Sequence, residues 1–272
     1  MKIKQLKKYI GLATLLSISA THASIIDVSI SGVSVYFDSN SDSDFDSTYG
    51  TENRRVRAEI YGDNYDGVVD GDISGNFTLI NIVDFDGRIY SSYKQTFNVT
   101  NNTGTRQDYA FNFSLLDAYL FAECDAVLLA CEDIDVRTSF VTQISLNRDV
   151  IWDAQAHLSF NPHSGVNTSS TGGLETTYNP TYRSLVTSPF SSTIELGSLG
   201  IGETFELIYS VSSLTIAYTL DSYAGTVYND IGARGINNVV QQLQSSTSVN
   251  SPVINSLFLC STICLIWKRK RK

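Results

Sequence analysis

Oxygen-bearing side chains at alternate positions form the first group whose spacing could do chemistry. The run consists of Asp38, Asn40, Asp42, Asp44 and Asp46. Carboxylate and amide oxygens placed close together are the ligands that a hard cation such as calcium takes. The run is not an EF-hand loop, because Ser43 stands where that loop has glycine and Tyr49 stands where it has glutamate.

A second acidic group follows, with glycines between its members. It comprises Asp63, Asp66, Asp70 and Asp72, with Gly62, Gly67 and Gly71 interspersed. Glycine and aspartate both favour turns, so these oxygens could also lie close together. Two interpretations remain for both groups: a calcium site, or solvated surface loops that add solubility.

Catalytic motifs are missing from the sequence. After His22, the histidines are His157, on the polar side of an expected strand, and His163, which follows Pro162. No nucleophile elbow, zinc-protease motif or phosphate-cradling loop occurs. We therefore expect a protein that is not an enzyme. A secreted hydrolase without a recognisable motif is the least favoured alternative, since carboxylate pairs cannot be judged from sequence.

Tyrosine is abundant, with 15 copies, and several tyrosines fall near polar segments. These are Tyr49, Tyr61, Tyr65, Tyr90, Tyr93, Tyr178 and Tyr182. Exposed tyrosines can stack on sugars or anchor a protein partner. The alternative is that their rings cap the rim of a sheet.

Alternation of apolar and polar residues predicts the elements that position these side chains. The apolar residues recur at every second position over residues 136–146, 152–160 and 205–211. Such a period of two is typical of strands with one buried face. Together with many Gly, Asn, Asp and Ser clusters, it predicts an all-β fold, an antiparallel β-sandwich of jelly-roll or immunoglobulin-like type, over residues 24–240.

Three local features refine this prediction. The apolar phase changes across Gly32, from Val28 and Ile30 to Val33 and Val35, which favours a β-bulge. Residues 115–129, rich in alanine and leucine, could form a short helix. Residues 196–209 resemble a strand, a glycine turn and a second strand, with glycines that permit positive φ.

The four cysteines form two pairs. Cys124 and Cys131 lie in the expected body, where an oxidising compartment would allow a disulfide. Two free thiols are the alternative. Cys260 and Cys264 lie in the apolar tail, where we expect them to act as small apolar residues.

Both ends of the chain predict export. Four lysines precede an apolar segment and small residues near Ala23, so residues 1–23 are predicted to be a signal peptide. A polar linker is expected over residues 241–248. The tail then contains an apolar stretch of 15 residues, 253–267, expected to be a marginal transmembrane helix of about 22 Å. Five cations close it: Lys268, Arg269, Lys270, Arg271 and Lys272. They would fix that end on the cytoplasmic side.

The segment 249–272 resembles a PEP-CTERM sorting signal. Its motif is Val249, Asn250, Ser251 and Pro252. The family's Pro-Glu-Pro is absent, and the motif is similar to Val-x-x-Pro variants instead. The resemblance implies export from a Gram-negative cell, removal of the leader by signal peptidase, transient anchoring in the inner membrane, and processing by an exosortase-like enzyme. A permanent anchor that is never cut remains the alternative.

Charge separates the body from its ends. The body carries 28 acidic residues against 10 cations, a net charge of −18, because nine cations lie in the two ends. Such a field disfavours nucleic acid as a partner. We therefore expect a structural or adhesive protein of the cell surface or extracellular matrix, with an extracellular polysaccharide as a possible partner. The alternative is a calcium-dependent carbohydrate- or matrix-binding module.

Overall fold

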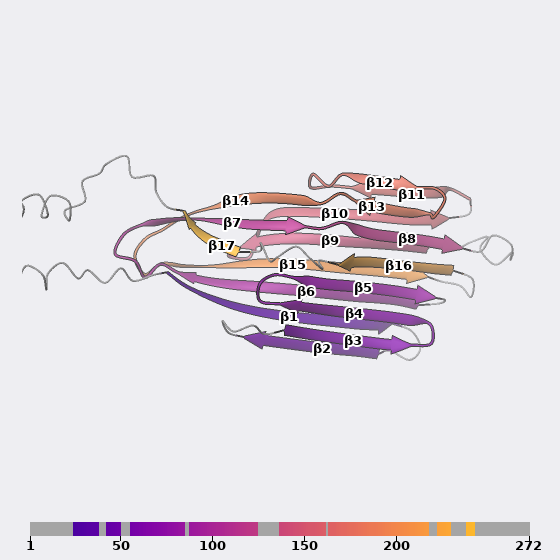
Figure 1. Ribbon diagram of the computed structural model, residues 1–272, viewed down its shortest axis with the longest axis horizontal. Helices are drawn as coiled ribbons and strands as arrows, with labels where there is room; N and C mark the ends of the chain where they lie inside the picture. The colour runs from indigo at the N-terminus through magenta and orange to yellow at the C-terminus, as the bar shows by residue number, and fades with distance from the viewer. Residues whose placement is uncertain are drawn as a thin grey trace, which may run out of the picture. The chain divides into compact units, whose positions relative to one another are not determined.

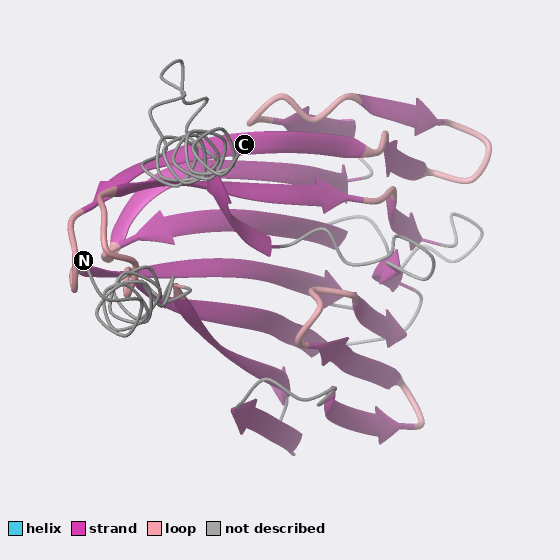
Figure 2. Cartoon of the chain, turned by 60° about the vertical axis from the view of Figure 1, so that its left-hand side comes forward, coloured by secondary structure: helices cyan, strands magenta, loops and turns pink. Residues whose placement is uncertain are grey.

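The computed structural model describes residues 24–37, 42–49, 55–84, 87–124, 136–161, 163–217, 222–229 and 238–242. Residues 24–242 form one compact unit. The predicted signal peptide, the sorting segment 249–272 and Cys131 lie outside the described residues. Figure 2 shows strands and loops in the described part of the chain. No helix within those ranges is long and apolar enough to cross a bilayer.

The first sheet has seven antiparallel strands, several of them 13 or 14 residues long. Their order across the sheet is β11 (Gly165–Ser170), β10 (Asp149–Asn161), β9 (Val136–Leu146), β15 (Thr204–Ala217), β6 (Gly87–Thr100), β1 (Ile25–Phe37) and β2 (Asp42–Tyr49). β2 is therefore one edge of this layer (Figure 1).

The second sheet also has seven antiparallel strands. Their order is β12 (Thr176–Asn179), β13 (Ser184–Thr187), β8 (Ala118–Cys124), β16 (Ser222–Asn229), β5 (Phe77–Asp84), β4 (Tyr65–Asp72) and β3 (Arg55–Gly62). Here β3 is an edge. Buried side chains from both sheets share one core, so the body is an antiparallel β-sandwich, as predicted. The jelly-roll or immunoglobulin-like type stays a prediction.

A small third sheet continues the second one. It contains β14 (Phe190–Leu199), β7 (Gln107–Leu115) and β17 (Asn238–Gln242), in that order. The order matches that of β13, β8 and β16, to which these strands connect along the chain, and Figure 1 shows the two groups end to end. At the break, the Ala118 amide donates to Thr187 Oγ1 at 2.8 Å. The second layer is thus interrupted opposite the long strands of the first.

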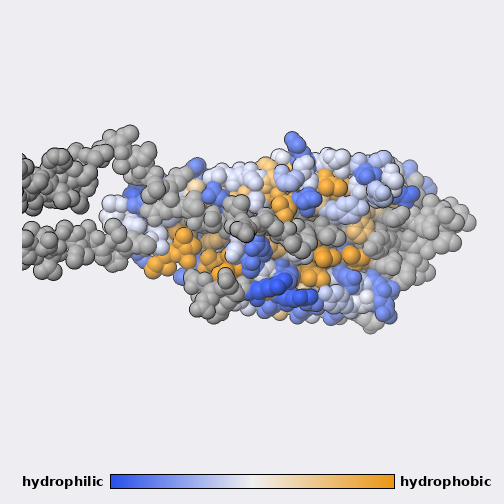
Figure 3. Space-filling model, viewed as in Figure 1, coloured by the Kyte–Doolittle hydropathy of each residue, from blue (hydrophilic) through white to orange (hydrophobic). Residues whose placement is uncertain are grey.

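The period-two prediction is confirmed in β9, β10 and β15. Their buried side chains include Phe140, Ile144, Ala156, Leu158, Phe205, Leu207, Tyr209 and Val211. Aromatic rings fill much of the space between the sheets; for example, Phe113 lies 4.8 Å from Trp152 and 6.4 Å from Tyr209 between ring centroids. On the surface in Figure 3, apolar residues appear in patches between hydrophilic ones. Not every apolar side chain is therefore used by the core.

The predicted bulge at Gly32 is wrong. The pairing of β1 with both β2 and β6 runs through Gly32 without a shift of register. Ile30, Gly32 and Ser34 all face inward, whereas Val33 faces outward. A Cβ at Gly32 would lie 2.9 Å from Val69 Cγ1, so a small residue fits this inward position. The change of apolar phase reflects a change of face, because Val33 and Val35 lie on the outside of the first sheet.

The helix considered for residues 115–129 is also wrong where the structure describes it. Residues 118–124 form β8, in which Ala118, Leu120 and Ala122 are buried. These residues have good helix propensity, but the pairing of β8 with β13 and with β16 overrides it. Small and apolar residues at alternate positions fit a crowded inner face.

The predicted glycine turn has the expected backbone but joins different sheets. Gly202, in the turn, has a φ of 76°, whereas Gly197, with a φ of 87°, lies at a shift of register within β14. β14 lies in the third sheet and β15 in the first, so the turn carries the chain between layers. At the other end of the body, β17 includes Gln241 and Gln242, which therefore pair with β7 although they were expected in the linker.

Gly172 provides a test of the packing between β10 and the turn after β11. Its φ is 68°, and an added Cβ would overlap the carbonyl oxygen of Asp153 and the Cβ of Ala154. Gly165 has a similar φ of 77° but open space around it. Gly165→Ala should cost about 1 to 2 kcal/mol through its backbone alone. The free energy of unfolding should fall by about 1 to 3 kcal/mol more in Gly172→Ala than in Gly165→Ala, because of the overlap.

Chemical denaturation of the two variants measures this difference. The melting temperature should fall in parallel, by roughly 2 to 4 °C for each kcal/mol of unfolding free energy lost in a domain of this size. Equal losses of unfolding free energy for Gly172→Ala and Gly165→Ala would contradict the close packing at Gly172.

Candidate functional site

The first predicted calcium group lies in an edge strand, not in a loop. Asp42, Asp44 and Asp46 belong to β2, whereas Asp38 and Asn40 lie outside the described residues. In each of the three, Oδ1 accepts the amide of the following residue: Ser43 N at 2.8 Å, Phe45 N at 2.9 Å and Ser47 N at 2.8 Å. One oxygen of each carboxylate thus satisfies a donor of β2 itself.

The second oxygen of each carboxylate reaches the other sheet. Asp46 Oδ2 accepts the amide of Arg57 at 2.9 Å, and Asp44 Oδ2 accepts the amide of Glu59 at 2.8 Å. Both donors belong to β3, the edge of the second sheet. Asp42 Oδ2 accepts the Tyr65 hydroxyl at 3.3 Å. We call Asp42, Asp44 and Asp46 the aspartate bridge.

The geometry of a strand explains why alternate residues form this bridge. Asp42, Asp44 and Asp46 pair with Tyr36, Ser34 and Gly32, the inward-facing positions of β1. Their side chains therefore project toward the second sheet. Edge strands carry unpaired backbone donors, and inward-pointing charged residues are one way of protecting them. The aspartate bridge closes this edge of the sandwich through side chains.

Tyr65 completes the bridge at its Asp42 end. Its ring stacks on Tyr36 with centroids 3.8 Å apart and planes at 10°. Burial raises the pKa of the Tyr65 phenol, and the charge of Asp42 and its hydrogen bond raise that pKa further. The phenol therefore stays protonated at neutral pH and can donate to Asp42.

The second predicted calcium group is spread along one hairpin. Asp63 lies in the turn between β3 and β4, and Asp66, Asp70 and Asp72 lie along β4. At about 3.3 Å per residue, Asp66 and Asp72 are roughly 20 Å apart along the strand, too far to share one ion. Among the described residues, no three or more His, Cys, Asp or Glu side chains gather at a common point.

The members of this second group have structural partners. Asp70 is largely buried and forms a two-pronged ion pair with Arg55 across β3 and β4. The hydrogen bond that Arg55 donates to Asp70 raises the pKa of Arg55, and the negative charges of Asp70 and Asp72 raise that pKa further. Asp72 Oδ1 accepts the Ser74 amide at 2.8 Å and thereby holds the turn before β5.

No protein-family model matches this chain, and no curated protein matches it.

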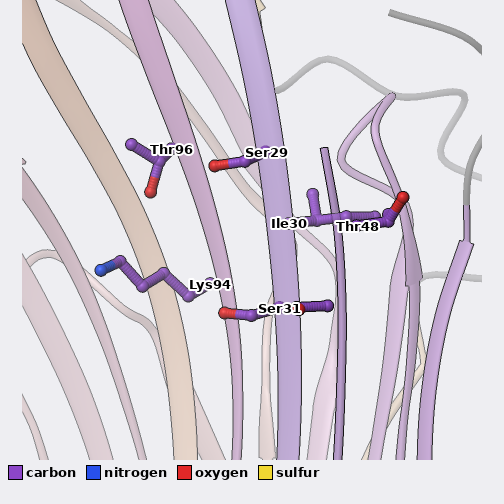
Figure 4. Close-up of a pocket in the computed structure, with 7 residues that line it drawn as sticks. Ser29, Ile30, Ser31, Thr48, Lys94 and Thr96 are labelled. Carbon is purple, nitrogen blue, oxygen red and sulfur yellow. The ribbon is translucent and has the colours of Figure 1, made fainter. Parts of the chain in front are cut away.

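A groove on the outer face of the first sheet was not predicted. It has a volume of about 350 Å³ and spans β1, β2 and β6. It is lined by the outward-facing Ser29, Ser31, Ser47, Lys94 and Thr96, and also by Ile30 and Thr48, which occupy inward-facing positions of β1 and β2. In Figure 4 the side chains of Ser29, Ser31, Lys94 and Thr96 project to one side of β1 and β6. Alternation against the buried residues Tyr93, Gln95 and Phe97 could have placed Lys94 and Thr96 on this face, but not the groove.

The remaining predicted residues are dispersed. Tyr93 is fully buried and stacks on Phe77, so it is not an exposed binding residue, whereas Tyr61, Tyr90 and Tyr182 are exposed. His157 lies on the outer face of β10, and the His163 amide donates to Asn161 Oδ1 at 2.9 Å in the turn before β11. Cys124 ends β8 opposite Ser222. Its disulfide with Cys131 stays a prediction.

Asp44→Asn tests the aspartate bridge. The amide offers one oxygen in place of two, so either Phe45 or Glu59 loses its acceptor. The free energy of unfolding should fall by about 0.5 to 1.5 kcal/mol, as for a typical hydrogen bond. Hydrogen exchange at the Phe45 and Glu59 amides should become faster. Asp63→Asn, in an exposed turn, is the matched control, and an equal loss in both variants would refute a bridging role.

Calcium titration tests the same carboxylates as metal ligands. Because the oxygens of the aspartate bridge already accept backbone amides, millimolar calcium should leave the melting temperature of the protein unchanged. Specific binding to the folded state would raise it. A rise that is present in the wild type and absent in Asp44→Asn would restore the calcium interpretation.

Proposed function

We propose that this chain is an exported, non-enzymatic protein of the cell surface or extracellular matrix, with a structural or adhesive role. It is delivered through the inner membrane, held there by its tail, and released by an exosortase-like enzyme acting near Pro252. The division of the chain is the observation that carries the proposal. Residues 24–242 form one compact sandwich unit, between a leader-like segment and a tail with an apolar stretch and five terminal cations.

The net charge of the body and the protection of one sheet edge are compatible with a location outside the cytoplasm. A net charge of −18 over residues 24–250 keeps copies of the body apart and soluble. The aspartate bridge protects the β2–β3 edge from pairing with strands of other molecules. A large antiparallel sandwich with protected edges is a durable unit for display at a surface.

Catalysis forms no part of the proposal. Neither His157 nor His163 has a recognised nucleophile motif beside it in the sequence. Fold alone does not define activity, so the proposal depends on these sequence features and not on the sandwich. The competing interpretation is a tail that stays in the membrane as a permanent anchor.

Intact mass of the protein recovered from its native cells tests the sorting step. The wild type should lack residues 1–23 and the basic end 268–272. Pro252→Ala should retain Trp267 and that basic end, because the processing motif is lost. The purified body should melt at the same temperature in both, since Pro252 lies beyond β17.

Ser248→Ala is the matched control, because it changes the chain just before the motif. It should be processed like the wild type. A wild-type mass that still includes residues 268–272 would contradict release and favour the permanent anchor.

A further inference from the structure

We propose that the groove on the outer face of the first sheet binds a saccharide that carries a carboxylate, such as a segment of a uronic-acid glycan. Lys94 would meet the carboxylate, and the serine and threonine hydroxyls would meet the sugar hydroxyls. The inference rests on the proposed export, because it assigns an extracellular polymer as the ligand of the body.

Lys94 is chemically distinctive in this chain. It is the only lysine between Lys8 and Lys268, within a body whose net charge is −18. Lys94 takes part in neither the Arg55–Asp70 nor the Arg57–Glu59 ion pair. Its partners across the sheet are Ser31 in β1 and Ser210 in β15, both uncharged. An exposed ammonium thus faces the groove without a neutralising carboxylate among the described residues.

Hydroxyl groups from three strands line the same groove as Lys94. Ser29 and Ser31 come from β1, Ser47 from β2 and Thr96 from β6. Each hydroxyl can both donate and accept a hydrogen bond, as sugar hydroxyls do. The volume of about 350 Å³ lies at the lower end of the range for small-ligand sites. The groove therefore matches one sugar unit or a short segment better than a bulky apolar ligand.

The charges around the groove give the ligand a direction. Past Thr96, Asn98 pairs with Asp27 on one side and with Glu206 on the other, so that end of the face repels an anion. In the opposite direction β6 presents Ser92 and then Tyr90, which is 37 % exposed. Tyr90 lies about 13 Å from Lys94 along the strand. A glycan bound at Lys94 would extend toward Tyr90.

An aromatic surface lies at that end of the face. Tyr90 pairs with Val35 and Leu214, and the guanidinium of Arg88 lies 4.8 Å from the centre of the Phe37 ring. Aromatic faces of this kind present an apolar body beside polar groups. This surface is suited to the apolar face of a sugar ring. Lys94 and Tyr90 therefore mark the two ends of the proposed binding path.

The test is calorimetric titration of the purified full chain in detergent micelles. The probes are a trimer of galacturonic acid and the methyl ester of the same trimer, in which a methyl group on each carboxyl removes the negative charge. The acid should bind, and the ester should bind about tenfold or more weakly. Lys94→Gln should weaken binding of the acid by about tenfold or more, as expected for a lost charge-assisted hydrogen bond. Arg106→Gln, which removes one exposed cation from the β6–β7 connection, should bind like the wild type.

A second variant tests the contribution of the serine and threonine hydroxyls of the groove independently of charge. Ser31→Leu fills the groove and should abolish binding of the acid while the melting temperature stays close to that of the wild type, because Ser31 lies on the outer face. Three results would overturn the inference: no binding by the wild type, equal binding of acid and ester, or unchanged binding by Lys94→Gln. Binding of hexaglutamate as tight as that of the acid would assign the groove to acidic peptides instead.

The two proposals fail separately. A chain that is processed in cells but does not bind the trimer would refute only the glycan site. A chain that binds the trimer but keeps its basic end in cells would refute only the sorting step.

Discussion

Unpaired backbone donors at the edges of two stacked sheets are the constraint on which this structure depends. On one side, β2 and β3 belong to different sheets, and the aspartate bridge supplies acceptors for the free amides of both strands. On the other side, the short turn between β11 and β12 joins the two layers covalently, and the Thr171 amide donates to Gln155 O at 2.9 Å. The sandwich is thus closed at its two sides by different chemistry.

The closure of the sandwich determines which polar side chains are free to contact a ligand. Carboxylates of β2 and β4 that resembled metal ligands are engaged in holding strands and turns, through backbone amides and Arg55. The outer face of the first sheet remains accessible, and its side chains are not needed for closure. There the hydroxyls of β1 and the single lysine of the body lie beside each other. Closure of the sandwich and the proposed glycan binding therefore involve different sets of polar residues.

Sequence periodicity predicted the long strands well because each has one buried face. β9, β10 and β15 keep the period of two over most of their length, so their core residues could be identified. It failed at Gly32 and in β8, where neighbouring strands decide which face is buried and whether the chain is extended. Alternating aspartates in β2 were interpreted as a loop, although alternation is itself the pattern of a strand. Asp44 and Glu59 are 15 residues apart, and only the stacking of two sheets brings them together.

The shortness of β17 has a mechanical consequence. Its five residues pair with β7, the one partner of β17 among the described strands. β1, at the other terminus of the body, is held over 13 residues by β6 and over eight by β2. Tension applied through the C-terminal segment would therefore peel β17 away one pair at a time, before it loads the long strands. β17 would then detach first, while the long strands of the sandwich stay paired.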